Sequence, residues 1–223
     1  MRKSIKLVLG TMTFGEQVFG EDVRAMIEYF LSQGYKELDT AYVYNQGKCE
    51  ILIGRALTEI DDPDVVVSTK VSPRITGKLD QKAVLAQFDE SLDSLRVKNI
   101  HTLYLHFPDP ATPLIYPLEA CAQLHSEGKF SQLGLSNFPA WMVAEVYNLC
   151  KTQGWVLPSV YQGVYNPLSR HAERELDNAL DYYGMCFYAY NPLAGGMLTD
   201  KYSRYDKGIK SGRFINRPNY QER

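Results

Sequence analysis

The sequence predicts an α/β fold, specifically a parallel (β/α)8 barrel of the TIM type that is incomplete, with seven of its eight strands present. Short apolar, β-branched segments alternate along the chain with segments whose apolar residues recur at helical spacing. The apolar segments begin roughly 30 residues apart, which is the length of one strand-and-helix crossover unit. This near-even spacing favours a closed barrel over an open sheet.

The expected elements follow one another along a single domain that covers residues 1–223. Strands are predicted at residues 6–12, 37–41, 65–70, 101–106, 132–137, 159–165 and 186–191. Helices are predicted at 23–31, 49–59, 81–95, 118–127, 141–153 and 170–183, where apolar residues recur at i, i+3 and i+4 and glycines follow several ends. After Gly195 the chain becomes polar and no further apolar segment appears. We therefore expect the C-terminal strand and helices of the barrel to be missing, which would leave two strand edges unpaired.

The charge balance and the cysteine content of the chain exclude several classes of function. The 223 residues include 24 basic and 26 acidic side chains, for a formal net charge of −2, and neither sign forms a long block. Nucleic acid and membrane are therefore not expected partners. The four cysteines are widely separated, which argues against structural zinc and a disulfide framework, and the N-terminus resembles neither a secretory signal nor a membrane span. A cytoplasmic protein is expected, and the sequence leaves its oligomeric state open, a homodimer included.

Four polar residues stand where parallel strands end, and functional groups of barrel proteins lie at those ends. Asp39 closes the second expected strand, Tyr44 follows it, Lys70 closes the third and His106 closes the fourth. Each also has a purely structural explanation. Asp39 could cap a turn, and Tyr44 is one of 16 tyrosines. Lys70 could be solvated, and His106 could be a hydrogen-bonded core histidine. Together they place a carboxylate, a phenol, an ammonium and an imidazole on one rim, which favours a catalytic site. No metal ligand set is expected, because His101 and His106 are five residues apart and face opposite ways.

This set suits proton donation to a carbonyl oxygen. An ammonium beside a tyrosine lowers the phenol pKa, so Lys70 is expected to lower the pKa of Tyr44. Asp39 is the available counter-ion for a desolvated Lys70. His106, as a neutral donor, could orient the substrate oxygen. None of these residues can supply hydride, so the chemistry requires a nicotinamide cofactor.

Ordered motifs at the strand ends resemble those of the aldo-keto reductases. They are residues 37–44 (ELDTAYVY), 68–70 (STK), 103–106 (LYLH), 134–138 (GLSNF) and 161–162 (YQ). Residues 8–12 (VLGTM), 160–166 (VYQGVYN) and 187–196 (FYAYNPLAGG) further resemble the branch of aflatoxin-aldehyde and succinic-semialdehyde reductases. The resemblance implies that Tyr44 is the general acid, since the family spacing of five residues after Asp39 selects it over Tyr42. It also implies that Lys70 and Asp39 tune Tyr44 and that His106 positions the carbonyl.

The same resemblance implies a cofactor site. Ser136, Asn137 and Gln162 would hydrogen-bond the nicotinamide carboxamide, and Tyr190 would stack on its ring. If the family resemblance is set aside, Ser136 and Asn137 are explained as a turn at the end of a strand, and Tyr190 as an aromatic side chain of the barrel. The remaining expected cofactor contacts are Asn191, Pro192, Leu193, Gly195, Gly196, Lys201 and Arg213.

These last contacts lie around the cofactor phosphates. The Gly195-Gly196 pair would let backbone N–H groups approach a pyrophosphate, and Lys201 adds positive charge. Arg213 matches a cofactor-contacting arginine of the branch, although a solvated loop arginine explains it equally well.

Two function hypotheses result. The first is NADPH-dependent reduction of small aldehydes, and some ketones, to alcohols, with NADPH preferred over NADH as a family expectation. The alternative is a catalytically impaired fragment that acts only as a folding or partner-binding remnant, because an open barrel exposes apolar interior surface.

Overall fold

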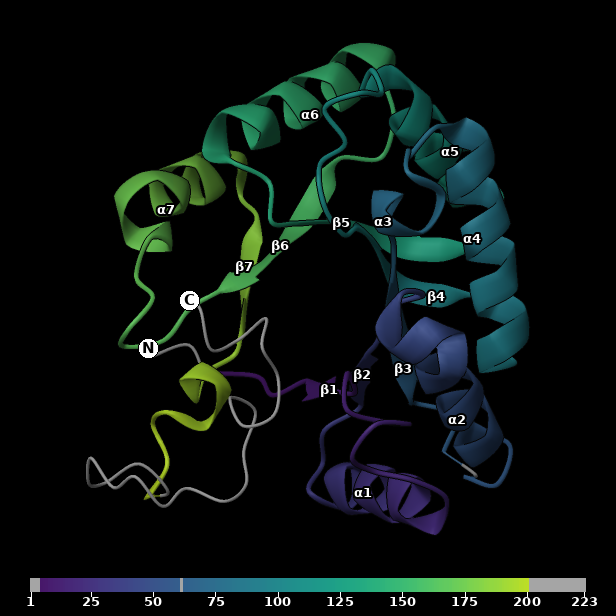
Figure 1. Cartoon of the computed structure of the whole chain (residues 1–223). Coiled ribbons are helices and arrows are strands. Elements are labelled where there is room, and N and C mark those ends of the chain that lie inside the picture. The colour runs from purple at the N-terminus through teal and green to yellow at the C-terminus, as the bar shows by residue number, and fades with distance from the viewer. Residues whose placement is uncertain (1–4, 61, 201–223) are drawn as a thin grey trace.

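The computed structural model describes residues 5–60 and 62–200 and contains one sheet of seven parallel strands (Figure 1). The strands pair in the order of the sequence, from β1 to β7. They are β1 (Leu9–Gly10), β2 (Glu37–Asp39), β3 (Val66–Val71), β4 (Ile100–Leu105), β5 (Phe130–Ser136), β6 (Pro158–Val164) and β7 (Cys186–Tyr190).

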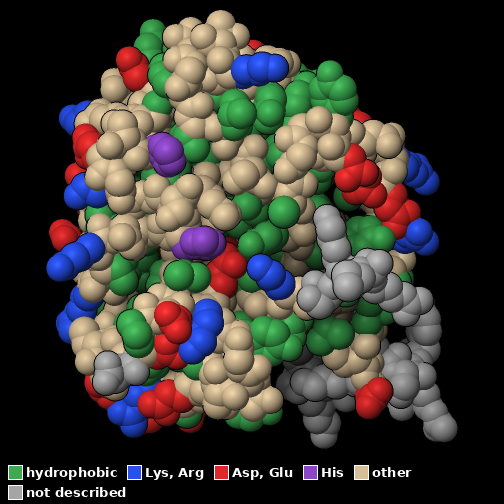
Figure 2. Space-filling model, turned by 180° about the vertical axis from the view of Figure 1, so that it is seen from behind, with side chains coloured by type: hydrophobic (Ala, Val, Ile, Leu, Met, Phe, Trp, Pro, Cys, Tyr) green, Lys and Arg blue, Asp and Glu red, His purple; other side chains and the backbone are tan. Residues whose placement is uncertain are grey.

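Helices alternate with the strands and surround the sheet (Figure 1). They are α1 (Glu21–Ser32), α2 (Lys48–Leu57), α3 (Pro73–Thr76), α4 (Gln81–Leu95), α5 (Ile115–Ser126), α6 (Ala140–Gln153) and α7 (Ala172–Tyr183), with 3-10 turns η1 (Tyr44–Gly47) and η2 (Ala194–Gly196). Among the described residues, no helix is both long and apolar enough to cross a bilayer. On the face of the molecule shown in Figure 2, acidic and basic side chains are interspersed.

Seven parallel strands with alternating helices confirm the predicted barrel class. Each expected strand and helix is present, and the boundaries differ by a few residues. The main difference is β1, which is expected over residues 6–12 but is only two residues long and pairs with β2 alone. The other end strand of the sheet is β7, in which Ala189 and Tyr190 are exposed, whereas β4 and β5 near the middle are largely buried.

The middle of the sheet holds an aromatic ring beneath the expected catalytic rim. Lys70, Tyr104 and Gly134 are neighbours across β3, β4 and β5. The Tyr104 ring is fully buried and the Lys70 ammonium lies 5.4 Å from its centroid. A Cβ atom at Gly134 would lie 2.3 Å from Cδ1 of Tyr104, so only glycine leaves room for this ring. Gly134 therefore sets the position of Tyr104, and Tyr104 supports Lys70.

Glu50 joins three elements behind the same rim. It lies on α2 and is fully buried, and its carboxylate accepts hydrogen bonds from Thr69 on β3 (2.5 Å) and Ser91 on α4 (3.1 Å). Burial raises the pKa of Glu50 to about 7, although the two hydroxyls and the charge of Lys70 act in the opposite direction. Glu50 therefore stabilises the packing of α2 best when it is protonated.

Gly134→Ala tests the close approach in the core. The added methyl group collides with the rigid, buried Tyr104 ring, so we expect the free energy of unfolding to fall by about 1–3 kcal/mol. Urea denaturation measures the loss. Gly10→Ala on β1 is the matched control, because a Cβ there meets nothing within 4 Å. Equal losses in the two variants would contradict the proposed packing.

Glu50→Gln tests the buried carboxyl through pH. An unfolded Glu50 titrates near 4.5 and the folded one near 7, so both states are protonated at low pH. As pH rises from 4.5 to 7 the unfolded state releases its proton first, and the wild type loses up to roughly 3 kcal/mol of stability.

The glutamine of Glu50→Gln stays neutral at every pH. The variant should therefore be more stable than wild type above pH 7, and its stability should not fall between pH 4.5 and 7. Thermal midpoints measured between pH 5 and 8 provide the comparison. Parallel pH profiles for the two proteins would show that Glu50 does not titrate in this range.

Candidate active site

The structure brings the four expected catalytic residues together at the carboxyl ends of neighbouring strands. Asp39 is the last residue of β2, Lys70 lies near the end of β3, His106 directly follows β4, and Tyr44 begins η1 after β2. The Lys70 ammonium lies 5.2 Å from the centroid of the Tyr44 ring. The rings of Tyr44 and His106 meet edge to face, with centroids 5.7 Å apart.

Lys70 is the most enclosed charged group of the site, with a side chain that is 0% exposed. Its Nζ donates to Oδ1 of Asp39 and to the backbone carbonyl of Thr40, both at 2.5 Å. Burial alone would lower the pKa of Lys70, but Asp39 and Tyr44 outweigh burial and raise it. Lys70 is therefore a permanent ammonium at neutral pH, with Asp39 as its counter-ion, as the sequence suggested.

The pKa of Tyr44 differs from the expectation. Burial raises it, and this effect outweighs the Lys70 ammonium, which lowers the pKa through its charge and a hydrogen bond. The expected net lowering is therefore wrong, although the influence of Lys70 has the expected sign. Tyr44 is only half-buried, but its ring packs against the core, and this packing could not be read from its position in a loop.

His106 is nearly enclosed and is held by aromatic contacts. Burial, Lys70 and Arg74 together lower the pKa of His106 to about 3, so its imidazole is neutral at physiological pH. Its ring stacks on Phe107 with centroids 4.5 Å apart. Nδ1 is buried and has no hydrogen-bond partner in the described part of the chain. The ring can therefore act as a neutral hydrogen-bond donor but not as a proton acid.

Tyr42, the competing tyrosine, points elsewhere. Its hydroxyl donates to Glu90 on α4, and this bond raises the pKa of Tyr42 to about 12. Of the two tyrosines, Tyr44 is the one whose ring lies beside Lys70 and His106.

Four expected cofactor residues lie at the ends of the next strands. Ser136 ends β5, Asn137 follows it, Gln162 is in β6 and Tyr190 ends β7. The Asn137 amide donates to the carbonyl of His106 and to Oγ of Ser136, both at 3.0 Å, and accepts from the Tyr190 hydroxyl at 2.9 Å. Asn137 thus joins this group to His106, with a backbone φ of 62° that asparagine tolerates.

Gln162 connects the same group to the catalytic residues. Its Nε2 donates to Oδ2 of Asp39 at 2.8 Å, while Oδ1 of Asp39 binds Lys70. This leaves Oε1 of Gln162 to accept a hydrogen bond, and the Ser136 hydroxyl lies on the neighbouring strand in register with Gln162. An acceptor, a hydroxyl and the exposed ring of Tyr190 at one rim fit a planar aromatic amide such as nicotinamide.

The turn after β7 contains the remaining described candidates. The backbone N–H of Gly195 donates to Oδ1 of Asn191 at 2.7 Å, and Asn191, Gly195 and Gly196 all have positive φ. Leu193 is exposed, and Pro192 lies between it and Asn191. The tight turn agrees with a glycine-dependent loop, but its Gly195 N–H is already bonded within the turn. Lys201 and Arg213 lie outside the described residues.

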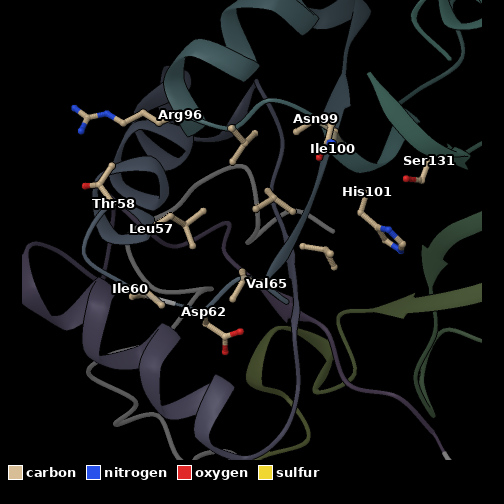
Figure 3. Close-up of a pocket in the computed structure, with 13 residues that line it drawn as sticks. Leu57, Thr58, Ile60, Asp62, Val65, Arg96, Asn99, Ile100, His101 and Ser131 are labelled. Atoms are coloured by element: carbon tan, nitrogen blue, oxygen red, sulfur yellow. The ribbon is translucent and has the colours of Figure 1, made fainter. Parts of the chain in front are cut away.

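A separate cavity lies at the opposite mouth of the barrel. It measures about 380 Å³ and is lined by the starts of β3 and β4, including Val65, Ile100 and His101 (Figure 3). Since Lys70 and His106 mark the other ends of these strands, the cavity is remote from the expected catalytic rim. Figure 3 shows the Arg96 side chain pointing away from it. Within the described residues, no group of three potential metal ligands is present.

Two residues at the rim were not anticipated from the sequence. Phe107 stacks on His106, and the guanidinium carbon of Arg74 lies 3.6 Å from the centroid of the Phe107 ring. Arg74 lies on α3, a single turn too short to show helical periodicity. The available signal was Ser72-Pro73, a capping residue followed by proline at the first helical position.

Comparisons with known proteins point to one family. The model of the aldo/keto reductase family matches residues 6–219. The chain is 46% identical to aflatoxin B1 aldehyde reductase member 2 of Rattus norvegicus, over 93% of this chain and 58% of that protein. It is 44% identical to aldo-keto reductase family 7 member A3 of Homo sapiens, over 93% of this chain and 64% of that protein. It is 33% identical to oxidoreductase sirO of Leptosphaeria maculans, over 94% of this chain and 68% of that protein.

The chain therefore spans about six-tenths of the length of the mammalian relatives that it matches. The match with the family model covers nearly all of the chain, including every strand end described above. By its sequence and its fold, the chain belongs to the aldo-keto reductase family.

Proposed function

We propose that this protein reduces aldehydes, and some ketones, to alcohols with NADPH, and that Tyr44 is the general acid. The observation that carries the proposal is the buried Lys70 ammonium, paired with Asp39 and lying 5.2 Å from the centroid of the Tyr44 ring. The names of the similar mammalian proteins, which are aldehyde reductases, support the substrate class.

In this mechanism the residues of the chain hold the proton and transfer it to the substrate. Tyr44 holds its proton at neutral pH, because burial raises its pKa, and delivers it to the carbonyl oxygen as negative charge develops there. The Lys70 ammonium stabilises the tyrosinate that remains, and Asp39 keeps Lys70 charged. The neutral imidazole of His106 donates a hydrogen bond to the same oxygen. When bound, NADPH supplies the hydride that the carbonyl carbon receives.

The cofactor would be held at the ends of β5, β6 and β7. Ser136 and Gln162 would bond the carboxamide, Asn137 would join them by exchanging one of its present partners, and Tyr190 would stack on the ring. Preference for NADPH over NADH is a family expectation.

The turn after β7 would meet the cofactor phosphates, with Lys201 and Arg213 adding charge. Its residues are Asn191, Pro192, Leu193, Gly195 and Gly196.

The second candidate is a non-catalytic chain that binds a partner. The exposure of β7 favours it, because a barrel strand with exposed Ala189 and Tyr190 leaves surface that another chain could cover. Addition of NADPH distinguishes the two candidates, because a ligand that binds the native state raises the thermal midpoint. An unchanged midpoint at millimolar NADPH would favour the second candidate.

Tyr44→Phe tests the acid role directly. Removing the hydroxyl removes the proton donor, so we expect reduction of a small aldehyde to fall by a factor of at least ~10² while NADPH binding changes little. Oxidation of NADPH followed by absorbance gives the rate, and fluorescence titration gives the affinity. Tyr42→Phe is the matched control, because its hydroxyl bonds to Glu90 away from Lys70 and its loss should leave turnover intact. Full activity of Tyr44→Phe would end the proposal.

A further inference from the structure

Phe107 lies between two planar side chains at the rim of the barrel. Its ring stacks on the imidazole of His106, with centroids 4.5 Å apart and planes 22° apart. The guanidinium carbon of Arg74 lies 3.6 Å from the centroid of the same ring. Two planar groups at these distances would overlap on one face of a phenyl ring, so Arg74 and His106 occupy opposite faces. The three side chains form a stack that ends on His106.

The imidazole of His106 depends on this stack because it lacks the usual anchor. In most catalytic histidines, a hydrogen bond to one ring nitrogen fixes the orientation and the tautomer. Nδ1 of His106 is buried and finds no hydrogen-bond partner among residues 5–60 and 62–200. The ring is fixed by packing instead, with Phe107 against its face and Tyr44 meeting it at 82°.

Burial of Nδ1 also selects a tautomer. A buried N–H without an acceptor is rarer in proteins than a buried acceptor without a donor. The proton of the neutral ring therefore belongs on Nε2. This tautomer gives the site the hydrogen-bond donor that the proposed reaction needs.

Arg74 is exposed, but its backbone is anchored. Ser72 caps α3 by accepting from the Arg74 N–H at 3.4 Å. The backbone of Ser72 is bonded twice to the Gln87 side chain of α4, at 2.8 and 3.0 Å. The start of α3 is thereby tied to α4, and Arg74 approaches Phe107 from a fixed position. A cation over an aromatic face is itself attractive.

We propose that Phe107, held by Arg74, is a positioning residue that fixes the plane of His106 and presents its Nε2–H to the substrate oxygen beside Tyr44. Its role in catalysis rests on the proposed function. The conformation of the imidazole does not, and it can be measured without cofactor or substrate. Arg74 has a second effect, because its charge opposes protonation of His106.

The test is ¹⁵N NMR of the protein labelled at its four histidines, with the His106 signals identified from a His106→Gln variant. Wild type should show one neutral Nε2–H pattern that persists well below pH 6. In Phe107→Leu the face contact is lost, so the His106 signals should move toward values averaged over both tautomers. Phe107→Tyr keeps the ring and should restore the wild-type pattern. Aldehyde turnover should fall roughly ten- to a hundredfold in Phe107→Leu alone.

Arg74→Met separates the charge from the stack. Its side chain can still cover Phe107, so the tautomer pattern should remain while the pKa of His106 rises from about 3. Arg174→Met on α7 removes the same charge at an exposed, distant position and should leave the His106 signals unchanged. A folded Phe107→Leu variant with the wild-type pattern would overturn the proposal, as would an Nδ1–H pattern in wild type. Activity retained by Tyr44→Phe would instead sink the proposed function and leave this result standing.

Discussion

The site depends on a single buried charge, the ammonium of Lys70. A fully enclosed cation is tolerated only when it is paired and hydrogen-bonded, and loss of one partner of such a pair typically costs about 3–5 kcal/mol. Two acceptors of Lys70 lie at the end of β2, namely the Asp39 carboxylate and the Thr40 carbonyl. The ammonium therefore ties β2 to β3 at the rim. Tyr104 and Gly134 support it from β4 and β5, so the charge also requires the packing of the barrel interior.

The same charge lowers the pKa of both aromatic neighbours, but the net shifts differ. It lowers the pKa of Tyr44, where burial acts in the other direction and prevails. It also lowers the pKa of His106, where burial and Arg74 act with it. The resting site thus contains one protonated phenol and one neutral imidazole. A general acid must hold its proton until charge develops on the substrate, so a raised pKa in the resting state is compatible with proton donation when the ammonium is adjacent.

The sequence predicts the scaffold better than the electrostatics. Apolar periodicity located the strands and helices, and the rule that barrel sites lie at strand ends predicted that Asp39, Lys70 and His106 share one rim, as they do. Burial could not be read in the same way. Glu50 occupies a position that resembles any acidic residue on an amphipathic helix, yet it is fully enclosed. The contact between Arg74 and Phe107 joins a four-residue turn to a strand end, and neither periodicity nor spacing encodes a stack across two loops.

Asp39 connects the catalytic candidates of the rim to the residues of the proposed cofactor site. Its Oδ1 binds Lys70, which acts on Tyr44, and its Oδ2 accepts from Gln162, a residue of the proposed nicotinamide site. A carboxylate that divides its oxygens in this way cannot change one partner without altering the electron density available to the other. The amide orientation that satisfies Asp39 also leaves Oε1 of Gln162 to accept a hydrogen bond, as the proposed carboxamide contact requires. The proposed proton donor and the proposed cofactor site therefore share one hydrogen-bonded unit, in which Asp39 binds both Lys70 and Gln162.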